Sequence, residues 1–305
     1  MFFPDTGERD EELSLAVTEL RYTQFFSKHI AAFAGKIITL GGDVNEFASG
    51  RGDKQFLSHS FLASPVTALV NPYSALGAGV VWMPSTETTV TSSIYTRNDA
   101  STTTGVSQLG EGATWSTAIR TQYEFSERPG GMNLAFQYSF DSDFTDLEGQ
   151  FVDQGVLNIP QNNTSWNTFW NMWQYVAVED SSNRKVDVSN GETDLQGVGV
   201  FARVGFADRD TNPVAWSFSA GIGGRGIFEG RDDDTYGVGF STSKLRQSLL
   251  TTLAPIDQSA SRWEAYYDFA LTPALGITLD VQYADTLLNN SSAATVFGIR
   301  MRASL

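Results

Sequence analysis

Apolar and polar side chains alternate along most of this sequence with a period of two residues. In the segment 196–208, valine, alanine and phenylalanine occupy every second position, and glycine, phenylalanine and arginine fill the positions between. Successive side chains of a β-strand point to opposite faces of a sheet, so this period predicts strands and not helices. The pattern recurs in about thirteen segments and predicts an all-β chain. The segments are 13–26, 31–40, 75–83, 87–97, 114–126, 130–141, 166–178, 196–208, 213–227, 234–245, 262–272, 276–286 and 294–305.

The predicted strands have the features of a membrane barrel. They are longer than the roughly five or six residues usual in globular proteins. Aromatic residues such as Trp115, Phe125 and Trp263 lie near the ends of the apolar stripe, where an interfacial girdle would place them. The opposite face carries glycine, serine, arginine and carboxylates, which suit a wet lumen better than a dry core. The pattern therefore favours an antiparallel transmembrane β-barrel, with residues 1–305 as a single outer-membrane domain.

A soluble or secreted sugar-binding β-sandwich is the alternative, because the sheets of such a protein also alternate. The positions of Trp115, Trp216 and Trp263 discriminate between the two. A lipid-facing belt of these side chains supports the barrel, and a sealed interior supports the sandwich.

Composition excludes several functions. The 305 residues include 20 lysines and arginines against 35 aspartates and glutamates, and the net charge of −15 argues against nucleic-acid binding. Cysteine is absent and only two histidines occur, so we predict no metal site and no cofactor. Glu264 and Asp268 share a strand face about 13 Å apart, too far for the carboxylate pair of a glycosidase. No GxSxG motif occurs either, and we predict that the protein is not an enzyme.

The connections between the predicted strands alternate between short and long, as is typical of outer-membrane barrels. Two connections break the pattern: 179–195 is long where a turn is expected, and 208–212 is short where a loop is expected. The short connections that fit are 84–86, 127–130 and 273–275, and the long ones are 41–74, 98–113, 142–165 and 246–261.

The segment 41–74 is the candidate constriction of the channel, because it is long enough to fold inward and rich in charge. Charged groups on inward loops set the selectivity of many pores. The alternative is a solvated surface loop whose charges balance each other. Its candidate residues are Glu46, Arg51, Asp53 and Lys54.

Further charged residues lie on the predicted lumen face of the strands. As a group they indicate a polar, water-filled interior, although each of them could simply pair with a neighbouring strand. These residues are Lys36, Arg120, Glu124, Arg203, Arg225, Glu264, Asp268, Arg300 and Arg302.

Two features suggest that an N-terminal portion is missing. Bacterial barrels normally have an even number of strands, and about thirteen are predicted here. The sequence also starts with the acidic stretch MFFPDTGERDEE instead of an export signal. We expect a truncated barrel; the alternative is a strand count that is wrong by one.

The stretch GVGVFARVGFADRDTNPVAWSFSAGIGGRGIFEGRDDDTYGVG at 197–239 resembles the carbohydrate-selective porin (OprB) family. The stretches 32–56, 71–82 and 264–283 agree with that resemblance. The resemblance implies a sixteen-stranded channel in the lipid of the outer membrane. Three strands of such a channel would be missing here. One departure is the final residue, Leu305, where outer-membrane barrels usually end in an aromatic residue.

The predicted function is facilitated diffusion of glucose-like sugars and other small polar solutes through a polar, arginine-containing lumen. Arginine suits a polyhydroxylated solute because its planar fork donates several hydrogen bonds in a fixed geometry. Small sugars are the expected permeants. No interface motif is legible, so the number of copies, including a homo-oligomer, stays open.

Overall fold

The structure, a computed structural model, describes residues 17–49, 55–179, 195–248, 256–285 and 292–303. Within these residues, thirteen antiparallel strands form one sheet, and each long strand pairs with the next long strand along the chain. The all-β prediction and all thirteen predicted strands are confirmed, with some of their ends shifted. The strands are β1 (Leu20–Phe25), β2 (Ile30–Ile38), β3 (Ser74–Trp82), β4 (Thr88–Thr96), β5 (Ala113–Phe125), β6 (Arg128–Phe140), β11 (Ser165–Val178), β12 (Gly197–Ala207), β13 (Val214–Arg225), β14 (Thr235–Leu245), β15 (Ser259–Thr272), β16 (Leu275–Ala284) and β17 (Ala294–Ala303).

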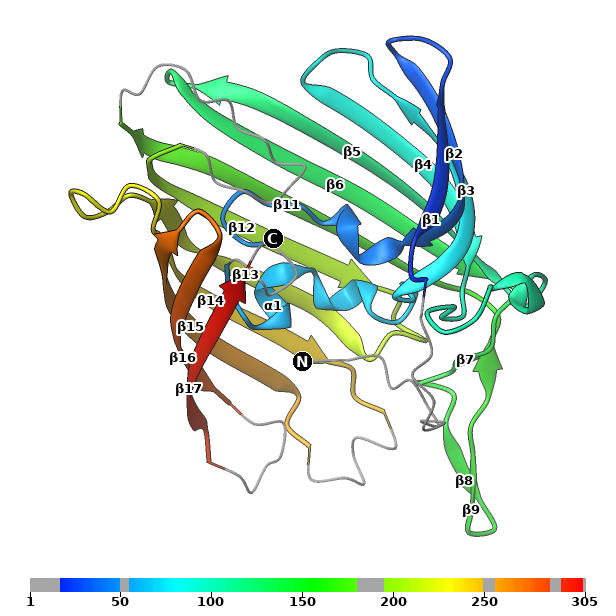
Figure 1. Ribbon diagram of the computed structural model, residues 1–305. Coiled ribbons are helices and arrows are strands. Elements are labelled where there is room, and N and C mark those ends of the chain that lie inside the picture. Colours follow the sequence, from blue (N-terminus) through cyan, green and yellow to red (C-terminus); the bar gives the residue numbers. More distant parts are fainter. Residues whose placement is uncertain (1–16, 50–54, 180–194, 249–255, 286–291, 304–305) are drawn as a thin grey trace.

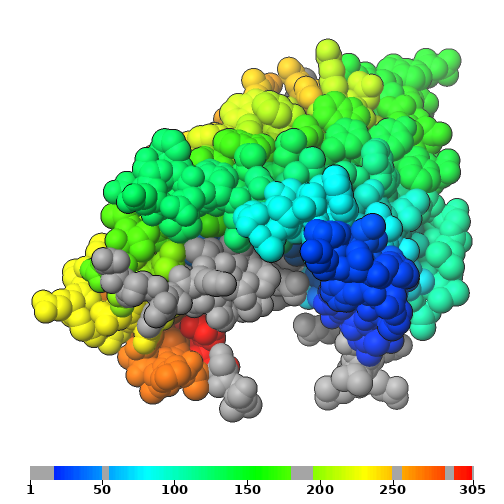
Figure 2. Space-filling view, turned by 90° about the horizontal axis from the view of Figure 1, so that it is seen from above, coloured from blue at the N-terminus to red at the C-terminus, as the bar shows by residue number. Residues whose placement is uncertain are grey.

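The sheet curves round so that its first and last strands both lie on the near side of Figure 1. Seen from above, the blue N-terminal part and the orange and red C-terminal part face each other across an open space (Figure 2). In the described part of the chain, β1 and β17 are the two ends of the sheet and do not pair with each other. The connections that break the length pattern, after β11 and after β12, also join neighbouring strands of the sheet.

The outer face of the sheet carries exposed apolar side chains. Trp115 and Trp263 are 43% and 54% exposed, and Trp216 pairs in register with the exposed Phe206 on the same face. A soluble protein would bury such side chains, whereas a lipid-facing belt exposes them. The soluble sandwich is therefore wrong, because one curved sheet presents these three tryptophans outward.

Shorter elements lie in the long connections. The connection between β6 and β11 forms two small hairpin pairs, and the connection between β4 and β5 contains a single 3-10 turn. Across the described ranges, no helix has the length and apolar character needed to cross a membrane. The elements are β7 (Phe144–Thr145), β8 (Phe151–Asp153), β9 (Val156–Asn158), β10 (Gln161–Asn162) and η4 (Val106–Gln108).

Residues 39–73 join β2 to β3, and we name them the inward segment; their described parts, 39–49 and 55–73, lie inside the curve of the sheet (Figure 1). These parts contain three helical turns: η1 (Thr39–Gly42), α1 (His59–Leu62) and η3 (Pro65–Thr67). The largest cluster of buried apolar side chains forms between this segment and the sheet. It consists of Phe47, Ala48, Phe56 and Phe61 of the segment with Trp173, Tyr175, Leu195, Phe201 and Tyr266 of the sheet and its connections.

Glycines make room for these rings on the inner face of β12, β13 and β14. A carbon added at Gly199 would lie 2.3 Å from the ring of Phe47, and one added at Gly239 would lie 2.6 Å from the ring of Phe61. Real side chains do not approach so closely, so only glycine fits there. We name this inner face, with Gly199, Gly223, Gly237 and Gly239, the glycine wall. The expectation of a wet lumen is wrong for the glycine wall, because aromatic rings cover it.

Candidate functional site

The inward segment contacts opposite parts of the sheet and so crosses the lumen. Near its start, the Asn133 side chain on β6 donates to the carbonyl of Gly42 at 2.8 Å. Further along, a guanidinium nitrogen of Arg300 on β17 donates to the carbonyl of Gln55 at 2.9 Å. Strands that lie far apart round the sheet thus hold one continuous segment.

The returning end of the segment is held by β4, β5 and β6. The hydroxyl of Thr114 donates to the carbonyl of Val70 at 3.1 Å. The hydroxyl of Tyr95 and the amide nitrogen of Gln137 both donate to the side-chain oxygen of Asn71, at 2.6 and 2.9 Å. The segment therefore runs out across the lumen and back to the wall where it began.

A buried ion pair lies at the centre of the segment. Arg203 on β12 is 1% exposed, and its Nε lies 2.8 Å from Oδ2 of Asp43. The other guanidinium nitrogens donate to the carbonyls of Ala48 and Phe61, at 3.1 and 2.9 Å. Asp43 in turn accepts a hydrogen bond of 2.8 Å from the backbone N–H of Ser64. Arg203 thus joins the outgoing and returning parts of the segment to one strand.

Two asparagines extend this network. The Asn45 amide donates to Oδ1 of Asn171 on β11 at 2.7 Å, and its own oxygen accepts from the backbone N–H of Phe47 and of Ala48. Asn171 donates to the carbonyl of Val44 at 3.0 Å. Asn171 and Asn133 are absent from the predicted site because they are uncharged. The alternating pattern places both asparagines on the inner face, and this position is the sequence signal that could have found them.

The inner face of β15, β16 and β17 is polar, and we name it the charged wall. Its charged residues are Arg262, Glu264, Asp268, Asp280, Arg300 and Arg302. Glu264 accepts hydrogen bonds from the backbone N–H of Leu57 and, at 3.0 Å, of Ser58. Arg262 donates to the hydroxyl of Ser58 at 2.5 Å. Residues 55–58 of the inward segment therefore rest on the charged wall.

Other members of the charged wall contact each other. The hydroxyl of Thr278 donates to Oδ1 of Asp268 at 2.5 Å and accepts from Arg300 at 2.9 Å. Arg302 lies 3.7 Å from Oδ2 of the same aspartate. Asp268, Thr278 and Arg302 thus form a row of polar contacts across β15, β16 and β17, and their partners here belong to the wall itself.

The remaining predicted site residues lie in different surroundings. Glu46 is fully buried and accepts a hydrogen bond of 2.8 Å from the hydroxyl of Tyr175. Arg120 lies half-buried on the inner face of β5, and Glu124 lies exposed near the end of that strand. Arg225 ends β13, where it pairs with a carboxylate of the following turn. Arg51, Asp53 and Lys54 fall outside the described residues.

Lys36 lies on the face opposite to the predicted one. Phe33 and Ile37 pack into an inner cluster with Ala75 and Tyr95, so their neighbour Lys36 faces outward. Its ammonium donates to the carbonyl of Thr103 at 2.8 Å, under the connection that follows β4. Alternation alone put Lys36 on the lumen face, because apolar residues such as Phe33 and Ile37 were expected to face lipid. Lys36 is therefore not a lumen residue.

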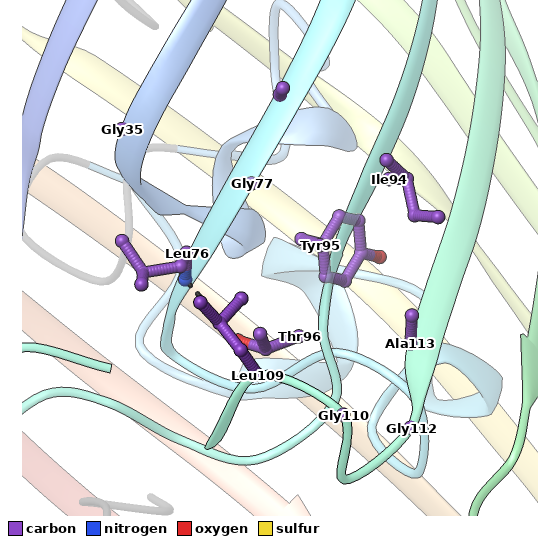
Figure 3. A pocket seen from close by; sticks show the side chains of 11 residues that line it. Gly35, Leu76, Gly77, Ile94, Tyr95, Thr96, Leu109, Gly110, Gly112 and Ala113 are labelled. Atoms are coloured by element: carbon purple, nitrogen blue, oxygen red, sulfur yellow. Dashed lines mark hydrogen bonds between the residues drawn. The ribbon is translucent and has the colours of Figure 1, made fainter. Parts of the chain in front are cut away.

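A cavity of about 380 Å³ lies close to that connection, at the loop ends of β3, β4 and β5 (Figure 3). Leu76, Ile94, Thr96 and Leu109 line it. Leu76 is paired with Lys36 and Ile94 is exposed, so these side chains belong to the outer face. The cavity is separate from the inward segment.

His59 begins α1 within the inward segment. Burial lowers its pKa, and the nearby Arg203 guanidinium lowers it further. The neutral ring is therefore favoured while the segment is docked. Over the described ranges, no group of three or more histidine, aspartate or glutamate side chains is placed to hold a metal ion.

Solved structures with a similar fold are outer-membrane channels. The high-pH structure of Pseudomonas putida OprB has a TM-score of 0.76 and 18% identity, and the match covers 94% of this chain and 72% of that one. The low-pH structure of the same protein has a TM-score of 0.57 and 17% identity, covering 94% and 66%. Pseudomonas aeruginosa OccK2 (OpdF), solved with glucuronate, has a TM-score of 0.51 and 7% identity, covering 93% and 70%. These similarities concern the fold.

No curated protein sequence matches the chain. A family model described as "Carbohydrate-selective porin, OprB family" matches residues 8–305. This match, with the porin structures, places the protein in the outer membrane and implies a channel rather than an enzyme. Because the model covers nearly the whole sequence, the chain belongs to the carbohydrate-selective porin, OprB family.

Proposed function

We propose that the protein passes glucose-like sugars and other small polar solutes by passive diffusion, and that the inward segment narrows the path. The observation that carries the proposal is that the described parts of the inward segment contact β6, β12 and β17 through buried and partly buried polar groups. A segment held from several sides keeps its place, and a fixed constriction selects solutes by size.

The solute path is proposed to lie beside the inward segment, along inner-face residues that remain partly accessible. Arg120 on β5 is half-buried and Glu124 is exposed, so Arg120 can donate hydrogen bonds to a neutral polyol and Glu124 can accept them. Arg225 and Arg302 are further candidates on the inner face of other strands, whereas Asp268 is buried between Thr278 and Arg302. By contrast, Glu46 and Arg203 are buried against protein and act on the segment.

The predicted constriction residues Arg51, Asp53 and Lys54 remain part of this proposal. They belong to the same connection, and we propose them on their charge and their place in the sequence alone. Replacement of Arg51 by alanine is expected to change sugar flux more than replacement of Arg97, which follows the end of β4.

Liposome swelling with the full protein tests the proposal. Swelling is expected to be faster in glucose than in an amino acid of similar size, and Arg120→Ala is expected to reduce that preference. Arg209→Ala, at an exposed arginine in a loop, is the matched control and should leave the preference unchanged. Equal swelling in both solutes would reject sugar selectivity, and no swelling would reject the channel itself.

A further inference from the structure

We infer that Glu264 is a positioning residue, which fixes the path of residues 55–58 across the lumen and thereby the width of the channel. The inference deepens the proposed function and rests on it for the meaning of the constriction. Glu264 then acts through the backbone of the inward segment and not by contact with a solute.

The contacts of its carboxylate support this role. One oxygen accepts the backbone N–H of Leu57, and the other accepts the N–H of Ser58 at 3.0 Å. Two consecutive amides facing two carboxylate oxygens define both the position and the direction of the chain. The side chain is 1% exposed, so no surface of Glu264 is left for a solute.

The neighbouring groups of the charged wall hold the same four residues. Arg262 donates to the hydroxyl of Ser58, and Arg300 donates to the carbonyl of Gln55. Asp280 on β16 interacts electrostatically with Glu264, and Gln282 donates to that aspartate at 2.9 Å. The charged groups around the contact are thus two arginines and a second carboxylate, all on the charged wall.

The alternative anchor of this region is apolar and does not specify direction. Phe56 stacks on Phe61 at a centroid distance of 4.6 Å and packs against Phe201 and Tyr266. Ring contacts of this kind tolerate sliding, whereas an unpaired buried N–H is costly. The path of the backbone beside Phe56 is therefore set by Glu264.

Glu264→Gln tests the inference in the full protein. Glutamine keeps one oxygen but turns an NH₂ group toward an N–H group, so one of the two hydrogen bonds is lost. Hydrogen exchange at the amides of residues 57 and 58 is expected to rise on the order of tenfold or more. Single-channel conductance in KCl is expected to shift from the wild-type value. Wild-type exchange and conductance in this variant would overturn the inference.

Asp268→Asn is the matched control, because it removes the same charge from the same strand face. Asp268 bonds to Thr278 and pairs with Arg302, both on the wall. Exchange at residues 57 and 58 is expected to stay at the wild-type level in this variant. A rise equal to that of Glu264→Gln would mean that wall charge in general, and not the contact, controls the segment.

A cross-link separates positioning from contact with the permeating ion. The sequence contains no cysteine, and a carbon added at Gly298 would lie 3.4 Å from the Leu57 side chain. Leu57→Cys with Gly298→Cys, closed directly or by a short thiol reagent, pins the segment to β17. In the Glu264→Gln background, closing this link is expected to restore the wild-type conductance. A link that closes without restoring it would overturn the inference.

A second variant covers the case in which Glu264→Gln does not assemble. Ser58 has a backbone φ of −73°, which proline adopts without strain. Ser58→Pro removes the N–H that Glu264 binds and leaves the wall intact, with Ser58→Ala as its control for the hydroxyl. A larger conductance shift for proline than for alanine is expected, and equal shifts would overturn the inference. The KCl readout needs no sugar, so loss of sugar preference in the wild type rejects only the proposed function.

Discussion

The glycine wall and the charged wall hold the same inward segment by different means. On the glycine wall, Phe47 and Phe61 fill spaces that a side chain would otherwise occupy. On the charged wall, Glu264 and Arg300 bond to backbone groups of residues 55–58. Apolar burial supplies most of the attraction and is not directional, whereas hydrogen bonds are directional and contribute little net energy. The glycine wall therefore keeps the segment in the lumen, and the charged wall fixes the path of its backbone.

Arg203 is the exception that tests the comparison most strongly, because it is a charged residue beside the glycine wall. Arg203→Met is expected to leave Asp43 buried without its ion-pair partner. The docking of the inward segment against the sheet should then weaken by about 3–5 kcal/mol. Hydrogen exchange of residues 43–48 and 61–64 measures the change. Arg209→Met removes an exposed pair with Glu148 and should change nothing measurable. A loss of docking energy as small as that of Arg209→Met would show that the aromatic rings alone hold the segment.

A side chain on the glycine wall should displace the rings. Gly239→Leu is expected to push Phe61 from its place and to cost about 1–3 kcal/mol of docking energy. Adding Phe61→Ala should recover part of the loss, because the two changes compete for one space. Gly42→Ala is the control, since nothing lies within 4 Å of a carbon added there. Equal exchange rates for Gly239→Leu and the control would contradict the close packing.

A polar contact on the glycine wall should count for less than the rings around it. The hydroxyls of Ser64 and Ser217 lie 3.2 Å apart in a buried position. Ser217→Ala is expected to weaken docking by roughly 0.5–1.5 kcal/mol. Hydrogen exchange at residues 64–67 measures this change. A cost larger than that of Gly239→Leu would mean that polar contacts, and not rings, hold the segment on the glycine wall.

Acid pH should weaken the docking of the inward segment by protonating His59. We expect this effect to be smaller than those of the preceding substitutions. The pKa of His59 is lowered in the docked state, so an undocked segment binds a proton more readily. Docking is therefore unaffected above about pH 6.5 and weakens as the pH falls below that value toward the docked pKa. His59→Gln should flatten this part of the pH profile of exchange. A profile that keeps its slope in the variant would assign the acid sensitivity to carboxylates.

The strands could be predicted from the sequence because the alternation that marks a strand is local. The packing on the glycine wall could not, because the rings that cover it come from another part of the chain. Gly199 and the Phe47 ring that covers it, for instance, are 152 positions apart. Lys36 shows the limit of alternation itself: Phe33 and Ile37 are apolar whether they face lipid or an inner cluster. Charge singled out Arg203 and Glu264 in the sequence, but it did not indicate that both contact the inward segment.

The same separation along the chain orders the assembly of the protein. The inward segment follows β2, yet Arg203, Glu264 and Arg300, which bind it, are 142 to 245 positions away from their partners. Contacts so distant form late, since the intervening chain must first be arranged. These separations predict that the described part of the inward segment docks only after β15, β16 and β17 have joined the sheet. An assembly intermediate without those strands would have a wider lumen than the finished protein, because nothing on the charged wall would yet hold the segment in place.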